Sequence, residues 1–312
     1  FTLSPASFVA GNNTIAVEVH LRTNTSADMS FDMQLLGIND AGTHNSSTAD
    51  LNLPSCSTVL FAGLYWGAGQ GAGGANTGWI TGEKNCKLKL PGSSSYTTIT
   101  STQTDYHNNT LIPGYAHTGF ECFKDITSMV NLSNPNGTYA VADVTSPVGI
   151  NDGYGGWTIV IVFGNPAMPP RNLNVFDGTA AVKSGSGNVD VNITGFLTPP
   201  TGPVNCELGA VVYDGDRVSQ DAYSFKQASS AVFYDLTPTA NNPTSNANDM
   251  WNSTISYKGT VVTTRNPAFQ NTLGYDADII NLPNAGNAQL SNSQTAATVR
   301  FSSPSENYVV HV

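Results

Sequence analysis

Three aspartates lie close together in the stretch VVYDGDRVSQD, where a β-branched run meets a turn. Ca²⁺ takes about six to eight oxygen ligands, several of them carboxylates on a tight loop, and neighbouring carboxylates repel one another unless a cation lies between them. The spacing allows three interpretations. The stretch is a calcium site formed by Asp214, Asp216 and Asp221, or a turn in which Arg217 pairs with Asp214 or Asp216, or it carries catalytic carboxylates.

Other catalytic patterns are weak. The chain has five histidines but neither an H-E-x-x-H motif nor a G-x-S-x-G nucleophile elbow. His107 and His117 flank the polar stretch NNTLIPGYA and are predicted to be exposed loop residues. Paired carboxylates for glycoside hydrolysis need only spatial proximity, which leaves four candidates open: Asp143, Asp152, Asp177 and Asp214. We expect no enzymatic activity.

The glycine-rich run GAGQGAGGANTG at 67–78 resembles a phosphate-binding loop in composition. A P-loop needs a Lys and a Ser or Thr that open a helix, and here Trp79 and Ile80 follow the glycines instead. The run is therefore predicted to be a flexible hairpin connection.

Aromatic pairs near the ends of two predicted strands offer a binding surface. An exposed row of rings stacks on sugars, whereas a buried row caps a sandwich core. Both interpretations stay open for Tyr65, Trp66, Tyr154 and Trp157.

The composition of the chain limits the binding partners that can be expected. Only 11% of the 312 residues are charged, and 22 acidic against 12 basic side chains give a net charge of −10. Such a chain lacks the basic patch that neutralises phosphates, so nucleic acid is not an expected partner. The longest apolar run, GGWTIVIVFG at 155–164, has the length of a strand and is too short to span a bilayer, so we expect no membrane insertion by this segment.

Four cysteines occur without a C-x-x-C pair and without histidines spaced for zinc. In a chain poor in lysine and rich in turn residues, disulfides and a secreted location are favoured over buried free thiols. Two of the cysteines start probable strands, which gives the preferred pairing Cys86–Cys122 and leaves Cys56 with Cys206.

Period-two alternation dominates the chain. It is clear in TIAVEVHL, and in VDVNITGF, where Val189, Val191 and Ile193 share one face. The best helical candidate is the short CFKDITSMV at 122–130. Many short strands separated by Gly and Pro turns predict an all-β fold with little helix, built as two β-sandwich, jelly-roll-like domains.

A faint internal repeat supports two domains. Residues 49–70 and 194–220 each contain a polar strand, a proline turn, a cysteine, an apolar strand of small residues and a glycine turn. The proline-rich GNPAMPPRN at 164–172 marks the expected boundary, with the first sandwich at 1–168 and the second at 169–312. The chain ends abruptly in ENYVVHV, and we expect the natural polypeptide to continue beyond residue 312.

From about Asn45 onward the sequence resembles a module near the N-terminus of large secreted bacterial surface proteins. The resemblance rests on the order and spacing of NSSTADLNLP, STVLFAGLYWGA, KLKLPGSSSYTTIT, DITSMV, GTYAVADV, GYGGWTIVIVFGNPAMPPRNLNVFDG, TGFLTPPTGPVNCELGAVVYDGDR, NSTIS and ATVRF. Those proteins carry tandem β-rich repeats and, in gliding and related bacteria, often end in a type IX secretion sorting domain. The resemblance implies an extracellular, cell-surface adhesin or filament-forming protein.

Two functions from different classes follow. The first is a non-enzymatic structural or adhesive module that associates with itself or with neighbouring modules of the same surface protein. The second is a carbohydrate-binding domain of a secreted protein. A self-associating module could assemble by strand addition. The segment FTLSPASFVAGNN at 1–13 could act as the donor strand, because it has apolar residues at positions 1, 3, 8 and 9. The same stretch is equally readable as the first strand of its own sandwich.

Overall fold

Alternating apolar and polar residues form strands throughout the described part of the chain. The computed structural model describes residues 43–72, 82–108, 111–115, 117–146, 153–185, 187–217, 220–237 and 249–312. Strand β10 (Val189–Thr194) is an example, because half-buried and exposed side chains alternate along it. The all-β prediction is confirmed, and the helix described is a single 3₁₀ turn, η2 (Ala285–Asn287).

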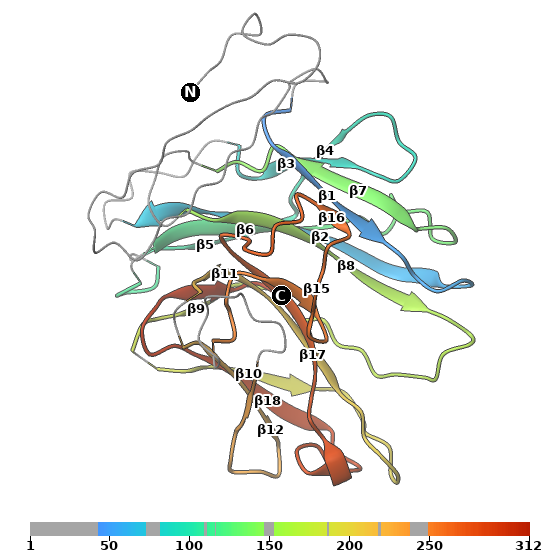
Figure 1. Cartoon of the computed structure of the whole chain (residues 1–312), viewed down its shortest axis with the longest axis vertical. Helices are drawn as coiled ribbons and strands as arrows, with labels where there is room; N and C mark the ends of the chain where they lie inside the picture. Colours follow the sequence, from blue (N-terminus) through green and yellow to red (C-terminus); the bar gives the residue numbers. More distant parts are fainter. Residues whose placement is uncertain are drawn as a thin grey trace, which may run out of the picture. The chain divides into compact units, whose positions relative to one another are not determined.

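The strands form four sheets, which we name by their position (Figure 1). Outer sheet 1 has the order β16 (Arg265–Asn266), β1 (Ser46–Leu51), β7 (Gly137–Ala142), β3 (Asn85–Lys89) and β4 (Thr97–Thr100). Inner sheet 1 has the order β5 (Gln103–His107), β6 (His117–Asp125), β2 (Thr58–Ala72) and β8 (Gly155–Gly164). Within each of these sheets, neighbouring strands run antiparallel.

The other two sheets hold most of the later strands. Inner sheet 2 has the order β15 (Thr260–Val261), β14 (Ile255–Tyr257), β17 (Gly274–Asn281), β11 (Glu207–Gly215), β19 (Tyr308–Val310) and β9 (Ala180–Val182). Outer sheet 2 has the order β10, β18 (Ala296–Ser302), β12 (Ala222–Gln227) and β13 (Tyr234–Leu236). Strands β14 and β17 run parallel.

Each outer sheet packs on an inner sheet through an apolar core. The first core joins outer sheet 1 to inner sheet 1 and contains Leu64, Trp66, Leu88, Phe120 and Val141. The second core joins inner sheet 2 to outer sheet 2 and contains Val212, Phe225, Trp251, Val299 and Tyr308. Sheets packed face to face over a shared core are β-sandwiches, as the sequence predicts. The boundary expected at 168 falls just after β8 and stays a prediction.

A tyrosine layer lies between the two inner sheets. It consists of Tyr115, Tyr154, Tyr213 and Tyr275 with Val211 and Val309. The alternate glycines of β2 make room for these rings, since a Cβ on Gly67 would lie 3.3 Å from the Tyr213 ring and one on Gly69 only 2.6 Å from the Tyr154 ring.

The glycines of 67–72 are therefore part of a strand, and the hairpin connection expected there is wrong over these residues; 73–78 lie outside the described part.

The stretch at 122–130, the best helical candidate in the sequence, is not a helix. Its first residues belong to β6, which is paired on both sides, with β5 and with β2. The Asp125 side chain then accepts the N–H of Thr127 at 2.8 Å and turns the chain, while Ile126 and Val130 are buried in the first core. Pairing on both sides of β6 outweighs the local helical pattern. Within the described ranges, no helix is long and apolar enough to cross a membrane.

Candidate functional site

Carboxylates gather where the loops at one end of inner sheet 2 meet, and those of Asp221, Asp249 and Asp276 are buried. We call Asp216, Asp221, Asp249, Asp276 and Glu306 the acidic cluster. Asp216 follows β11, Asp221 precedes β12, Asp249 precedes β14, Asp276 lies in β17, and Glu306 lies between β18 and β19.

Backbone contacts tie these loops together. The N–H of Met250 donates to the carbonyl oxygen of Asp221 at 3.0 Å. The N–H of Asp216 donates to Oε1 of Glu306 at 3.2 Å. The Ser253 hydroxyl donates to the Gly215 carbonyl oxygen at 2.6 Å and accepts the N–H of Gly274 at 2.9 Å. Residues far apart in sequence thus occupy one small volume.

Asp276 is fully buried. It pairs with Val212 across the β11–β17 ladder, so its side chain shares the face of Val212, which belongs to the second core. Its Oδ1 accepts the N–H of Thr254 at 2.9 Å, whereas its Oδ2 has no hydrogen-bond partner among the described residues. A Cβ on Gly215 would lie 2.4 Å from that Oδ2 atom, so only glycine leaves room for the carboxylate.

Asp221 and Asp249 are equally inaccessible, each with 0% exposure. Neither oxygen of either carboxylate has a hydrogen-bond partner of good geometry within the described ranges. Burial, with the nearby charges of Asp221 and Asp216, raises the pKa of Asp249 to about 8. Burial also raises the pKa of Asp276 well above its usual range, and Asp278, Asp249 and Asp221 add to the effect. Desolvated carboxylates that repel one another resist ionisation.

Asp221 also has its pKa raised, mainly by burial. Glu306 and Ser303 lie close enough to lower this pKa, and the charge of Asp216 raises it further, but burial outweighs the favourable contacts. The five members therefore influence one another, and sequence spacing alone pointed to only two of them.

Asp214, the third carboxylate of the expected calcium site, faces a different neighbour. Its Oδ2 lies 3.2 Å from Nδ1 of His117. The cause is a β-bulge between Tyr213 and Gly215, at which Asp214 takes a left-handed φ of 70°. The pairing of Arg217 with Asp214 or Asp216 stays a prediction. Within the described ranges, no group of three or more His, Cys, Asp or Glu side chains is arranged to hold a metal ion.

The aromatic candidates mostly lie inside the molecule. Tyr65, Trp66 and Tyr154 are at most 3% exposed, so their rings cannot stack on a sugar in this fold. Trp157 is half-buried, packs against the first core and donates its Nε1–H to the hydroxyl of Ser47 at 2.6 Å. Core packing is what the structure shows for these rings.

The two histidines expected in an exposed loop are in strands. His107 ends β5 and is fully buried, with Nε2 2.8 Å from Oη of Tyr154 and Nδ1 3.2 Å from Oε2 of Glu121. His117 starts β6 and is mostly buried against Asp214. The exposed-loop prediction is wrong for both residues, because the polar stretch between them is a connection between two paired strands.

The cysteines are free thiols, and neither expected disulfide is formed. Cys86 and Cys122 are both buried in the first core, where the Cys122 thiol lies 3.4 Å from the Thr104 hydroxyl. Cys56 is exposed, whereas Cys206 packs against the second core. The predicted Cys56–Cys206 pair is therefore split between different sandwiches.

The catalytic carboxylate candidates do not converge. Asp143 binds Nζ of Lys87 at 2.8 Å and Nδ1 of His44 at 3.1 Å on outer sheet 1. Asp177 lies in the exposed connection before β9, and Asp152 lies outside the described residues. Asp214 is held by His117. No pair of these carboxylates is brought together for acid–base work by the contacts of the described chain.

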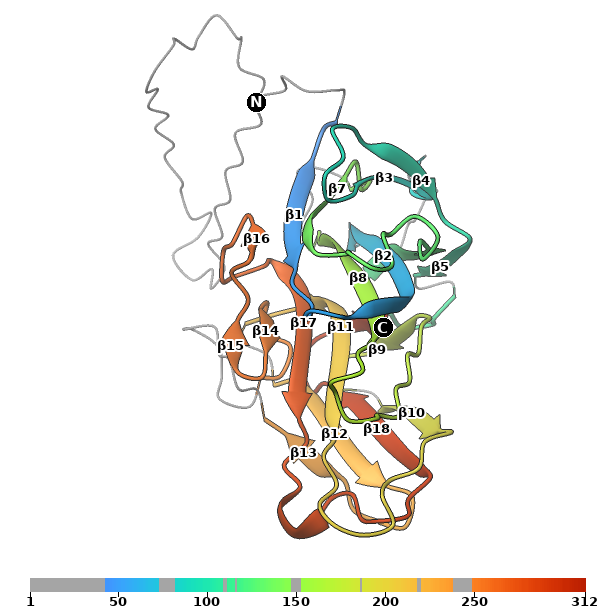
Figure 2. The same ribbon diagram turned by 90° about the vertical axis from the view of Figure 1, so that its right-hand side faces the viewer.

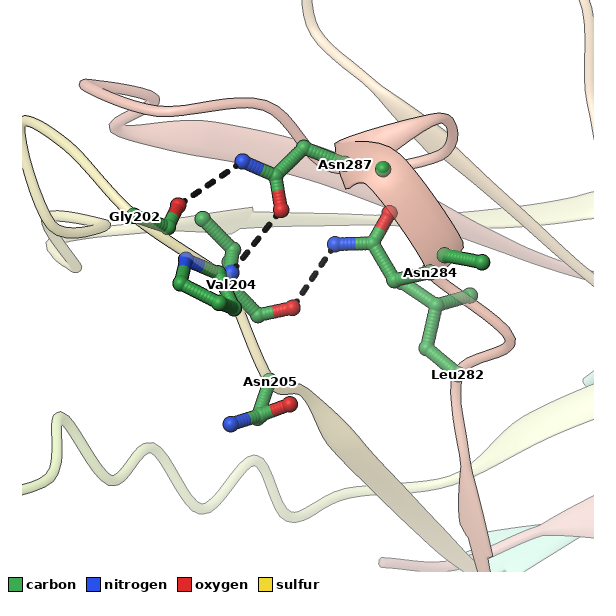
Figure 3. Close-up of a pocket in the computed structure, with 9 residues that line it drawn as sticks. Gly202, Val204, Asn205, Leu282, Asn284 and Asn287 are labelled. Atoms are coloured by element: carbon green, nitrogen blue, oxygen red, sulfur yellow. Dashed lines mark hydrogen bonds between the residues drawn. The ribbon is translucent and has the colours of Figure 1, made fainter.

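A cavity of about 500 Å³ lies at the far end of the second sandwich, beside η2 (Figure 3). The side-chain amides of two asparagines that line the cavity form hydrogen bonds with the backbone around it. Asn287 accepts the N–H of Val204 and donates to the Gly202 carbonyl oxygen, both at 2.9 Å, and Asn284 donates to the Val204 carbonyl oxygen at 2.8 Å. These asparagines fix the 202–204 loop.

Comparison with known proteins gives no identity. No family model matches the chain, and no curated protein matches it. Among solved structures, the mavirus major capsid protein aligns over 96% of this chain and 93% of its own length, with 9% identity and a TM-score of 0.16. A TM-score this low supports no inference about fold or function.

Proposed function

We propose that the chain is a structural or adhesive module of a larger extracellular cell-surface protein, and that it assembles by strand addition at the edge of inner sheet 1. The two-domain, jelly-roll arrangement belongs to the same proposal. The single observation that carries it is the edge strand β8, whose outer side pairs with none of the described strands.

Strand β8 offers a long row of backbone groups for pairing. It pairs with β2 from Thr58 to Ala68, and among the described strands none pairs with its other side. Its sequence, GGWTIVIVFG, contains no charged residue and no proline, and nine of its ten residues are half-buried. Edges of this kind normally carry lysines, prolines or bulges that prevent pairing with another chain. Strand β8 itself carries neither a charge nor a proline, and the irregularity of its ladder with β2, between Val59 and Phe61, lies on β2, which favours an edge that is used.

The opposite edge of the same sheet is built differently. Strand β5 has five residues, QTDYH, and carries the charge of Asp105. A short, charged edge resists strand addition, so the two edges of inner sheet 1 make a matched pair for an experiment. The donor in this proposal is the 1–13 segment of a neighbouring copy, which lies outside the described residues.

Electron microscopy of purified protein tests the proposal. A Val162→Lys variant places a charge in β8, where the flexible lysine stem lets the ammonium group reach water and the monomer still fold. We expect this variant and a deletion of 1–13 to abolish assembly, while Gln103→Lys on β5 leaves it unchanged. Assemblies that persist in both the lysine variant at 162 and the deletion would defeat strand addition at this edge.

A further inference from the structure

We propose that the acidic cluster is a binding site for a divalent cation, with Ca²⁺ as its ligand, held by the carboxylates of Asp249 and Asp276 together with backbone carbonyl oxygens and water. This inference is independent of the strand-addition proposal. It shares only Asp221 and Asp216 with the loop that the sequence singled out.

Unsatisfied oxygens are the first argument. Three of the four carboxylate oxygens of Asp249 and Asp276 have no hydrogen-bond partner of good geometry among the described residues, and both side chains have 0% exposure. Buried polar atoms are nearly always paired, so each exception needs an explanation, and a bound ion is one. Protonation is the competing explanation, because a neutral carboxyl group can donate to a neighbouring carboxylate; the calcium titration below separates the two.

The chemistry of the donors selects the type of cation. The acidic cluster contains only carboxylates, without histidine or cysteine, and hard oxygen ligands favour Ca²⁺ or Mg²⁺ over zinc or copper. Mg²⁺ demands near-ideal octahedral geometry, whereas Ca²⁺ accepts irregular sets of oxygens and readily takes backbone carbonyls. Ligands that come from a loop and a strand, with backbone carbonyl oxygens beside them, form an irregular set, which favours Ca²⁺.

The second argument is steric and concerns Gly215. The position that a Cβ would take at this residue is 2.4 Å from Oδ2 of Asp276 and 2.8 Å from the carbonyl oxygen of Trp251. The missing side chain therefore brings an unpaired carboxylate oxygen and a backbone carbonyl oxygen into the same small space. A mixed carboxylate and carbonyl set is typical of calcium.

The carboxylates alone do not complete the site. No three acidic side chains of the described residues form a ready metal centre, so carbonyl oxygens and water have to supply part of the coordination. Trp251 lies beside the cluster, which makes its indole ring a suitable energy donor to a bound lanthanide ion; the ring stacks on Phe301 and contacts Tyr308 at a tilt.

Terbium luminescence and calcium titration test the proposal on the full chain. We expect excitation of tryptophan to give Tb³⁺ emission that Ca²⁺ displaces, and Ca²⁺ to raise the melting temperature of chelator-treated protein. Asp249→Asn and Asp276→Asn keep the side-chain shape and remove a charge, so each should weaken Ca²⁺ binding at least tenfold. The exposed Asp235→Asn is the matched control and should bind as the wild type does.

Two results would overturn the site. One is a wild-type protein whose melting temperature and Tb³⁺ emission do not respond to Ca²⁺; the other is unchanged Ca²⁺ affinity in both asparagine variants. Misfolding of a variant does not confuse the outcome, because the wild-type titration stands alone. In the presence of chelator the variants should melt no lower than the wild type, since each removes a buried, unpaired acid.

Discussion

The imidazole of His107 and the carboxylate of Glu121 form a fully buried pair, with Nδ1 and Oε2 3.2 Å apart. The pair belongs to inner sheet 1 and points toward the tyrosine layer, where His107 also contacts Tyr154. Burial opposes ionisation of Glu121, but the charge of His107 and hydrogen bonds from His107 and Thr179 outweigh it and lower the pKa of this carboxyl group.

Substitution of Glu121 should therefore destabilise the fold. Glu121→Gln keeps the size and removes the charge that His107 meets, and the expected loss is about 2–4 kcal/mol in the free energy of unfolding. Urea denaturation measures it, with the exposed Asp235→Asn as control. A loss below about 0.5 kcal/mol, the range of ordinary surface substitutions, would show that the pair contributes little.

Acid should destabilise the protein through His311. Burial lowers the pKa of this histidine; Glu121, Asp105 and Asp177 raise it, and His107 lowers it further. The unfolded chain protonates His311 near its usual pKa of about 6.5, before the folded chain does, so the stability present above that pH is lost as pH falls toward the lower folded pKa.

Denaturant unfolding between pH 8 and pH 5 tests this. His311→Phe keeps an aromatic ring against Tyr65 and Tyr213 and should flatten the loss over this range. The lowered pKa of Glu121 adds a separate loss only at more acidic pH, below its unfolded value of about 4.5. An identical pH dependence in the phenylalanine variant would contradict the assignment to His311.

Gly156 should tolerate no side chain, whereas its neighbour should. A Cβ on Gly156 would lie 2.2 Å from the Tyr275 ring, but a Cβ on Gly155 would meet nothing closer than 3.6 Å. Gly156→Ala is expected to lower stability by about 1–3 kcal/mol through overpacking, and Gly155→Ala by much less. Equal melting temperatures for the two variants would show that the inner sheets separate easily.

Thiol reactivity distinguishes free cysteines from bridges. Cys56 is exposed and should react at once with a thiol reagent in the folded protein. Burial raises the pKa of Cys122 to about 11 and also raises that of Cys86, so both should react only after unfolding. Four reactive thiols in denaturant are expected from the structure. If denatured, unreduced protein gave none, the disulfides predicted from the sequence would be present after all.

Short-range patterns predicted the strands well. Alternation in VDVNITGF gave β10, and the apolar GGWTIVIVFG gave β8 with its bounds. The sequence patterns did not predict the full length of β2, because glycine has a low strand propensity. The glycines of β2 leave room for the tyrosine rings that pack against this strand. That requirement comes from another sheet and leaves no local signal.

The acidic cluster shows the same limit. Asp216 and Asp221 are neighbours in sequence and could be suspected, but Asp249 and Glu306 come from other loops and Asp276 from strand β17. Only the β11–β17 register and the Ser253 contacts bring them together. A signal existed in the run of alternating aspartates at 276 and 278, which is unusual for a strand with one buried face.

The small strand β16 has a consequence for the integrity of the chain. It comes late in the sequence yet pairs with β1, where Thr48 lies opposite Asn266, and the N–H of Asp50 donates to the Thr264 carbonyl oxygen at 2.8 Å (Figure 2). The connection at 171–177, by contrast, is exposed along its whole length. A protease that cuts this connection would therefore leave two fragments that remain associated, since β16 and the tyrosine layer join them without a continuous backbone. Cleavage there would break one peptide bond and leave the architecture in place.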